Sequence, residues 1–202
     1  MGLTIHYQGS LNSKEKITQL VNELEDISKE MGWEYTLIEK SKDDKDSVPP
    51  LNGIVITTAK GCEMLSFIFD KDGKLRHPVA LMYYEYDDKN QLYVSIKTQF
   101  ASPEDHIVVI KLLKYIKKEY INDLEVFDEG EYWESSDKER LVYLFNFLKE
   151  KIEQFAKIIE NSDELKGGEN SEDLINKLEK LITKHLNQVD SVKVVNKKKK
   201  SN

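Results

Sequence analysis

The order of apolar and polar positions predicts a chain that begins with strands and ends with helices. Residues 3–9 alternate apolar and polar side chains, which is the period of a strand with one buried face. Residues 17–31 instead carry apolar side chains at helical spacing, and Gly32 follows them as a stop signal. We therefore expect a strand followed by an amphipathic helix.

Further strands are predicted where short apolar runs are separated by polar turn formers. The connections at 70–73 (DKDG) and 87–90 (DDKN) are short enough for antiparallel hairpins. The charged segment at 41–50, which ends in two prolines, predicts a surface loop before the apolar run that begins at residue 51. The predicted strands cover residues 33–38, 51–58, 64–69, 75–86, 92–99 and, in a short piece, 123–128.

Helix signals dominate the second half of the chain. Ser102 and Pro103 have the order of an N-cap followed by proline at the first helical position. Ser136 and Glu139 have the spacing of a capping box before a long helix. Its apolar stripe comprises Leu141, Leu144, Phe145, Leu148, Ile152, Phe155 and Ile159. A glycine-containing loop and a last amphipathic pattern then predict a helical hairpin.

These elements predict an α+β fold with a largely antiparallel sheet of about five to six strands in β-α-β-β-β-β-α order. Two helices are expected on one face of that sheet, followed by the C-terminal helical hairpin. We expect the α+β domain to span residues 1–135 and the hairpin residues 136–188. Residues 189–202 are rich in lysine and lack periodicity, which predicts a disordered tail.

Charge and composition narrow the function classes. The 202-residue chain has a formal net charge of −7, and its last fifteen residues contribute +4, which leaves −11 for residues 1–187. An acidic body with only two arginines argues against sequence-specific nucleic-acid binding. At most, weak electrostatic contact is expected through the tail residues Lys197, Lys198, Lys199 and Lys200.

Targeting and cysteine signals are sparse. No apolar run is long enough for a membrane span and no signal peptide is recognisable, so we expect a cytoplasmic protein without membrane contact. The excess of lysine, asparagine and isoleucine favours a bacterial or phage origin. Cys62 is the only cysteine, which excludes an intramolecular disulfide and a zinc site built on cysteines.

One polar cluster is the candidate site. One half of the cluster lies around the start of the second predicted helix, and the other half lies in the DEGEYW segment, residues 128–133. The two halves meet if this segment folds back over the helix start. A histidine among carboxylates can bind a divalent metal or act in acid–base chemistry. Alternatively, His106 begins the buried face of its helix, and the acidic residues occupy the favourable first turn. The cluster comprises Lys97, Gln99, Glu104, Asp105, His106, Asp128, Glu129, Glu131 and Trp133.

The leading interpretation is a small acidic binding or regulatory protein without a catalytic motif or cofactor. It acts on a protein partner, or on a second copy, through its acidic surface or through residues 136–188. The alternative is a metal-dependent hydrolase. In that case His106, Glu129 and Glu131 are the catalytic candidates, and His106, Asp128 and Glu131 are the candidate metal ligands.

Overall fold

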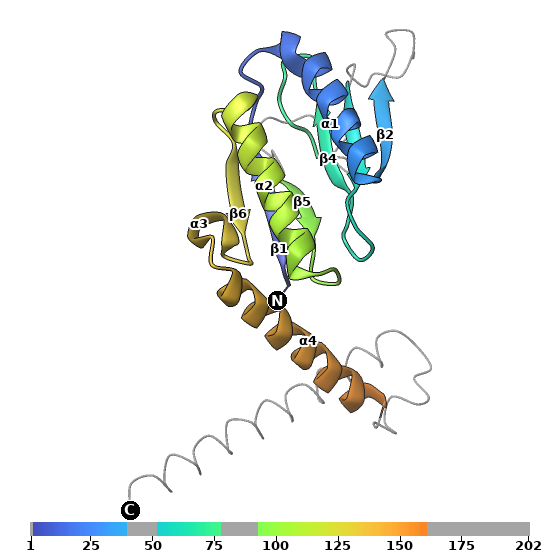
Figure 1. The fold of residues 1–202 in the computed structure, drawn as a ribbon, viewed down its shortest axis with the longest axis vertical. Helices are drawn as coiled ribbons and strands as arrows, with labels where there is room; N and C mark the ends of the chain where they lie inside the picture. Colours follow the sequence, from blue (N-terminus) through green and yellow to red (C-terminus); the bar gives the residue numbers. More distant parts are fainter. Residues whose placement is uncertain (1, 40–51, 78–92, 161–202) are drawn as a thin grey trace, which may run out of the picture. The chain divides into compact units, whose positions relative to one another are not determined.

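Six β-strands and four α-helices make up the part of the chain that the computed structural model describes, residues 2–39, 52–77 and 93–160 (Figure 1). The strands are β1 (Thr4–Gln8), β2 (Glu34–Glu39), β3 (Asn52–Thr57), β4 (Leu65–Phe69), β5 (Val94–Lys97) and β6 (Glu125–Asp128). The helices are α1 (Ile17–Met31), which follows a 3-10 turn at Lys14–Lys16, α2 (Pro103–Glu119), α3 (Tyr132–Ser135) and α4 (Lys138–Glu160).

The chain divides into two compact units, Met1–Leu148 and Lys149–Asn202. The first unit holds every described strand together with α1, α2 and α3, and α4 begins in it. Of the second unit, the structure describes only the remaining part of α4.

The strands form two antiparallel sheets of three strands each, in the orders β5-β1-β6 and β2-β3-β4. The expected mixed α+β class and antiparallel pairing are confirmed, but the expectation of one sheet of five or six strands is wrong for the described residues. In the first sheet His6 lies between Ser95 of β5 and Phe127 of β6. The two sheets are nevertheless linked to each other.

A tyrosine side chain explains why the sheets are separate at their junction. The Tyr7 hydroxyl donates to the Ser66 carbonyl at 2.7 Å and accepts from the Ser66 N–H at 3.1 Å. This side chain therefore takes both backbone groups that Ser66 would otherwise offer to a neighbouring strand. Beyond β1, backbone bonds from Leu11 N to Gly73 O at 2.9 Å and from Leu75 N to Gly9 O at 3.0 Å join the segment that follows β1 to the segment that follows β4.

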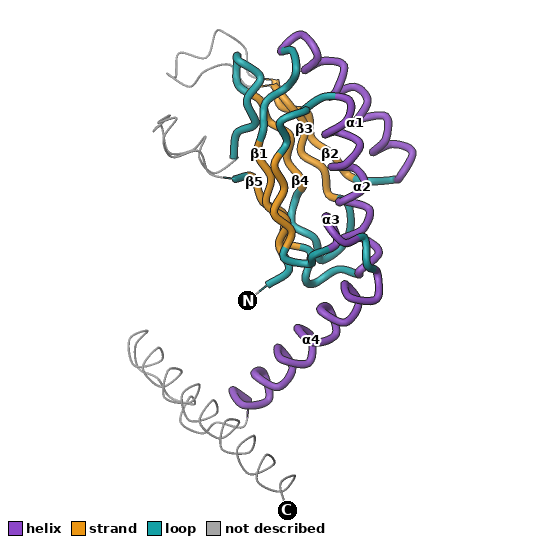
Figure 2. The backbone as a smooth tube through the Cα atoms, turned by 90° about the vertical axis from the view of Figure 1, so that its left-hand side faces the viewer, coloured by secondary structure: helices purple, strands orange, loops and turns teal. Residues whose placement is uncertain are grey.

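The main core lies between the strands and the helices α1 and α2, which cover the same side of the strands (Figure 2). Alternation along each strand directs every second side chain to this core. For example, Ile5 and Tyr7 are fully buried on β1, whereas His6 between them is only half-buried. A smaller apolar cluster gathers Leu3, Ile107, Leu141, Phe145 and Leu148.

Two of the predicted helix starts have different outcomes. The start of α2 is confirmed, because Ser102 and Asp105 form a reciprocal capping box with Pro103 in the first turn. The predicted capping box of Ser136 with Glu139 is wrong. Ser136 adopts a left-handed conformation with φ of 53° and ends α3, and the Asp137 carboxylate instead accepts from Arg140 N at 2.9 Å.

Some sequence predictions fall outside the described residues. These are most of the strand predicted at 75–86, the second helix of the hairpin and the lysine-rich tail. Among the helices that the structure does describe, none combines the length and the apolar character needed to cross a membrane.

Candidate functional site

The start of α2 sets the position of His106. In the capping box, Ser102 Oγ accepts from Asp105 N at 3.1 Å, and Asp105 Oδ2 accepts from Ser102 N at 3.0 Å. These bonds fix the first helical turn, in which His106 follows Asp105 directly. The His106 side chain points into the interior and is fully buried.

His106 joins three parts of the first unit. Its Nδ1 lies 2.7 Å from the Thr98 hydroxyl, and that hydroxyl lies 3.2 Å from the carbonyl oxygen of Leu3. Its Nε2 lies 3.1 Å from Asp128 Oδ1. The Phe145 ring of α4 meets the imidazole edge-on at 5.9 Å between ring centres. His106 therefore ties α2 to β6 and to the first turns of α4.

The His106 imidazole is also closely packed on the side that faces Gly130. A Cβ atom added at Gly130 would lie 2.8 Å from the His106 ring and equally close to Leu141. Any larger residue at position 130 would therefore displace the ring or the helix. The glycine of the DEGEYW segment is required here for the close approach of its backbone to His106.

Asp128 organises the DEGEYW segment from the end of β6. Its Oδ1 accepts from Gly130 N at 2.7 Å, and its Oδ2 accepts from Tyr132 N at 2.8 Å and Trp133 N at 2.9 Å. A carboxylate in this position satisfies the free N–H groups at the start of α3 and complements the dipole of that short helix.

The charge of Asp128 is stabilised despite its burial. Burial raises the pKa of this carboxyl, but His106 and the N–H groups of Trp133 and Gly130 together outweigh it and hold the pKa below its usual range. Asp128 is therefore an anion at neutral pH. The Asp128 side chain is also buried, so its charged form depends on these partners for stabilisation.

The remaining carboxylates of the predicted cluster have separate partners. Glu129 Oε2 accepts from Thr4 N at 2.9 Å. Glu131 is exposed and pairs with Arg140 at 3.0 Å, an ion pair that lowers the Glu131 pKa. Glu104 is likewise exposed and lies 2.7 Å from Lys138 Nζ. The structure thus joins His106 to Asp128 and gives these three carboxylates other partners.

The other predicted members also have local contacts. Gln99 Oε1 accepts from Leu3 N at 3.3 Å, and the backbone N–H of Lys97 donates to the Glu63 carboxylate at 2.9 Å. Trp133 is half-buried, with the Lys114 ammonium 5.6 Å from its ring centre.

A divalent metal does not fit the donor set at His106. Both of its ring nitrogens face protein groups, and both oxygens of Asp128 accept from backbone N–H groups. Over the described ranges, no three or more histidine, cysteine, aspartate or glutamate side chains gather as a metal site would require. The metal-dependent hydrolase stays a prediction without a supporting geometry in this part of the chain.

Thr98 is the member of this site that sequence reasoning missed. It follows Val94 and Ile96 at steps of two, so alternation along β5 places it on the buried face of the sheet. A buried hydroxyl requires a hydrogen-bond partner, and His106 at the start of the next helix provides one.

In the described residues, the fold and this site define a mixed α+β protein with two three-stranded antiparallel sheets and a buried histidine–aspartate pair that links a helix start to a strand end. Comparison of the chain with family models, with curated proteins and with solved structures finds no match.

Proposed function

We propose that this protein is a non-enzymatic binding or regulatory protein that acts through protein–protein contact, with α4 as the contact helix. The observation that carries this proposal is the apolar stripe of α4, whose N-terminal members are buried and whose later members are exposed. The polar groups of His106 and Asp128, by contrast, are used to hold the first unit together.

The stripe has the spacing of a helix that packs along another helix. Its members follow one another in alternating steps of four and three residues: Leu141, Phe145, Leu148, Ile152 and Phe155. The first three are buried in the cluster that contains Leu3 and Ile107. Ile152 and Phe155 are 41% and 40% exposed, although they continue the same face.

A second aromatic surface lies on another face of the helix. The Tyr143 and Phe147 rings stack with their centres 6.3 Å apart, and Tyr143 is 57% exposed. Large apolar side chains that gather at a surface are typical of protein–protein contact sites. Tyrosine and phenylalanine are among the residues enriched at such sites.

Charge beside the stripe favours a particular kind of partner. When Phe145 and Leu148 take the two core positions of a heptad, Lys149 and Lys151 take the two flanking positions. Both lysines are exposed. A partner helix with Glu or Asp at its own flanking positions would complement them, whereas lysines facing lysines would repel.

The test compares three versions of the full-length protein. The wild type, the double variant Ile152→Ser/Phe155→Ser and the control Phe127→Ser are each immobilised, and bound host proteins are quantified. Phe127 is a suitable control because it is also a large exposed apolar side chain, 61% exposed, and belongs to β6 and not to α4. Light scattering on the same three proteins measures self-association.

The wild type is expected to recover a stoichiometric partner rather than to self-associate, because its flanking lysines would repel those of a second copy. The double variant should lose this binding by about tenfold or more, because truncation of central apolar contacts removes most interface energy. The control should retain it. A wild type that stays monomeric without a stoichiometric partner, or three proteins that behave alike, would contradict the proposal.

A further inference from the structure

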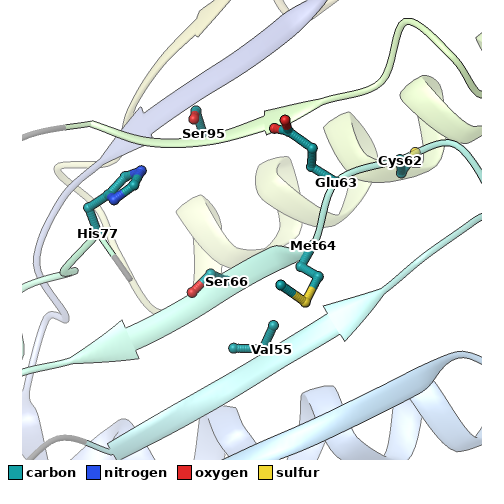
Figure 3. A pocket seen from close by; sticks show the side chains of 7 residues that line it. All are labelled: Val55, Cys62, Glu63, Met64, Ser66, His77 and Ser95. Atoms are coloured by element: carbon teal, nitrogen blue, oxygen red, sulfur yellow. The ribbon is translucent and has the colours of Figure 1, made fainter. Parts of the chain in front are cut away.

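A pocket of about 520 Å³ opens at the junction of the two sheets, a volume in the range of small-molecule sites (Figure 3). Ser66 of β4 and Ser95 of β5 line it from the two sheets, and Val55 of β3 lies beside them. On each strand the neighbouring residues are fully or almost fully buried in the core, so alternation turns these three side chains to the opposite face. The other lining residues are Cys62, Glu63, Met64 and His77.

The Ser66 hydroxyl is a buried polar group without a hydrogen-bond partner in the described residues. Ser66 is only 2% exposed. Its backbone N–H and C=O both bond to the Tyr7 hydroxyl, so the Ser66 side chain alone is left unsatisfied. Buried hydroxyls in native proteins are nearly always paired, and a ligand in this pocket would provide the missing partner.

The charge of the pocket selects among ligands. Among the described lining residues Glu63 is the only one with a formal charge at neutral pH, and one of its oxygens accepts from Lys97 N at 2.9 Å. Burial lowers the pKa of His77 and raises the pKa of the Cys62 thiol, so both are neutral at pH 7. No lysine or arginine is among the described residues that line the pocket. An anion would therefore be repelled and a cation attracted.

We propose that this pocket binds a small organic amine in its ammonium form. The ammonium group lies near Glu63, a donor or acceptor of the ligand meets the Ser66 hydroxyl, and the hydrocarbon part of the ligand rests on Val55 and Met64. This site is distinct from the α4 surface, because its described lining residues all belong to strands and connections of the first unit.

The test is an NMR titration of the full-length protein with 2-phenylethylammonium, followed through backbone amide signals. Shifts are expected at Val55, Ser66 and Ser95. Phenylacetate carries the same ring with the opposite charge and should cause none. Nα-acetyl-lysine amide is the third probe: shifts with both amines support a lysine side chain as the source of the ammonium group, and shifts with 2-phenylethylammonium alone support a free amine.

Two variants separate the roles of charge and hydroxyl. Glu63→Gln keeps an acceptor for Lys97 N but removes the charge, and it should weaken amine binding by about twofold to fivefold, because Glu63 is exposed and water screens its charge. Ser66→Ala should weaken binding by about threefold to tenfold. It should leave the thermal midpoint of the free protein unchanged or higher, because it removes an unpaired buried hydroxyl.

Glu30→Gln is the matched control, since Glu30 is an exposed carboxylate on α1. It should bind the amine like the wild type. The proposal is overturned if neither amine shifts the pocket amides at millimolar concentration, if phenylacetate binds as well as the amines, or if Glu30→Gln weakens binding as much as Glu63→Gln. A lower thermal midpoint of free Ser66→Ala would also overturn it, because the hydroxyl would then have a structural partner.

Discussion

The two ends of the α4 stripe carry the same kind of side chain in different surroundings. Phe145 is buried beside His106, whereas Phe155, three turns later on the same face, is 40% exposed. The sequence pattern is continuous across both. Helical periodicity therefore identifies the apolar face of a helix but does not reveal what covers that face.

The buried end of α4 is held by groups outside the helix. Asp128 caps α3 through Tyr132 N and Trp133 N, and His106 packs against Gly130 and Phe145. These contacts connect β6, α2 and α4 around the buried contact between His106 and Asp128. They explain why the first turns of α4 belong to the first unit, which ends at Leu148.

The largest expected effect comes from truncating the buried end. Phe145→Ala should lower the free energy of unfolding by about 3–5 kcal/mol, because it removes a buried aromatic ring and leaves a cavity beside His106. Phe155→Ala is the matched change at the exposed end and should alter stability by less than about 1 kcal/mol. Urea denaturation of both variants measures the difference. Equal losses would show that the two ends are equally buried.

A smaller loss is expected when the buried charge is neutralised. Asp128→Asn preserves shape, but it replaces a charged acceptor of three backbone N–H groups with a neutral amide. The free energy of unfolding should fall by about 1.5–3 kcal/mol, the range for hydrogen bonds to a charged group. Glu131→Gln, which changes an exposed carboxylate of the same segment, should have little effect. A similar loss in both variants would mean that burial of Asp128 is unimportant.

The same carboxyl makes stability depend on pH. The pKa of Asp128 is lower in the folded protein than its ordinary value. Its contribution to stability is therefore complete above the unfolded pKa of about 3.9 and is lost as the pH falls through the folded pKa. Asp128→Asn lacks this contribution, so the stability difference between wild type and variant should shrink below about pH 4. Denaturation midpoints of both proteins across this range measure it, and a difference that stays constant would contradict the assignment.

Local features of the fold were predictable from the sequence, whereas long-range pairings were not. The cap at Ser102–Pro103 and the alternation around Ile5 depend on neighbours in the chain, and both are present as predicted. The split into two sheets depends on Tyr7 and Ser66, which lie 59 positions apart. No local pattern indicates that a tyrosine hydroxyl will take the backbone bonds of a distant strand.

The same distinction between local and long-range features applies to the candidate site. The burial of His106 agrees with its place on the apolar stripe of α2, which the sequence showed as the alternative to an open site. That Asp128 rather than Glu131 meets the imidazole depends on the end of β6 and on the tight approach of Gly130. The cap before α4 was displaced from Ser136 to Asp137 because Ser136 ends α3, a helix too short for periodicity to reveal.

The smallest expected effect is a difference in hydrogen exchange between the two ends of α4, and it needs no substitution. Amide hydrogen exchange in the buried turns of α4, residues 141–148, should require opening of the first unit and be independent of protein concentration. Residues 149–157 are exposed, so their amides should exchange through local fraying and be far less protected.

If the exposed end binds a second copy, protection there alone should rise with protein concentration, because association stabilises only the residues that it covers. Exchange measured by mass spectrometry at two concentrations tests both halves at once. Strong protection at both ends in dilute protein would show that the stripe of α4 is already covered along its whole length, which would remove the observation on which the proposed contact helix depends.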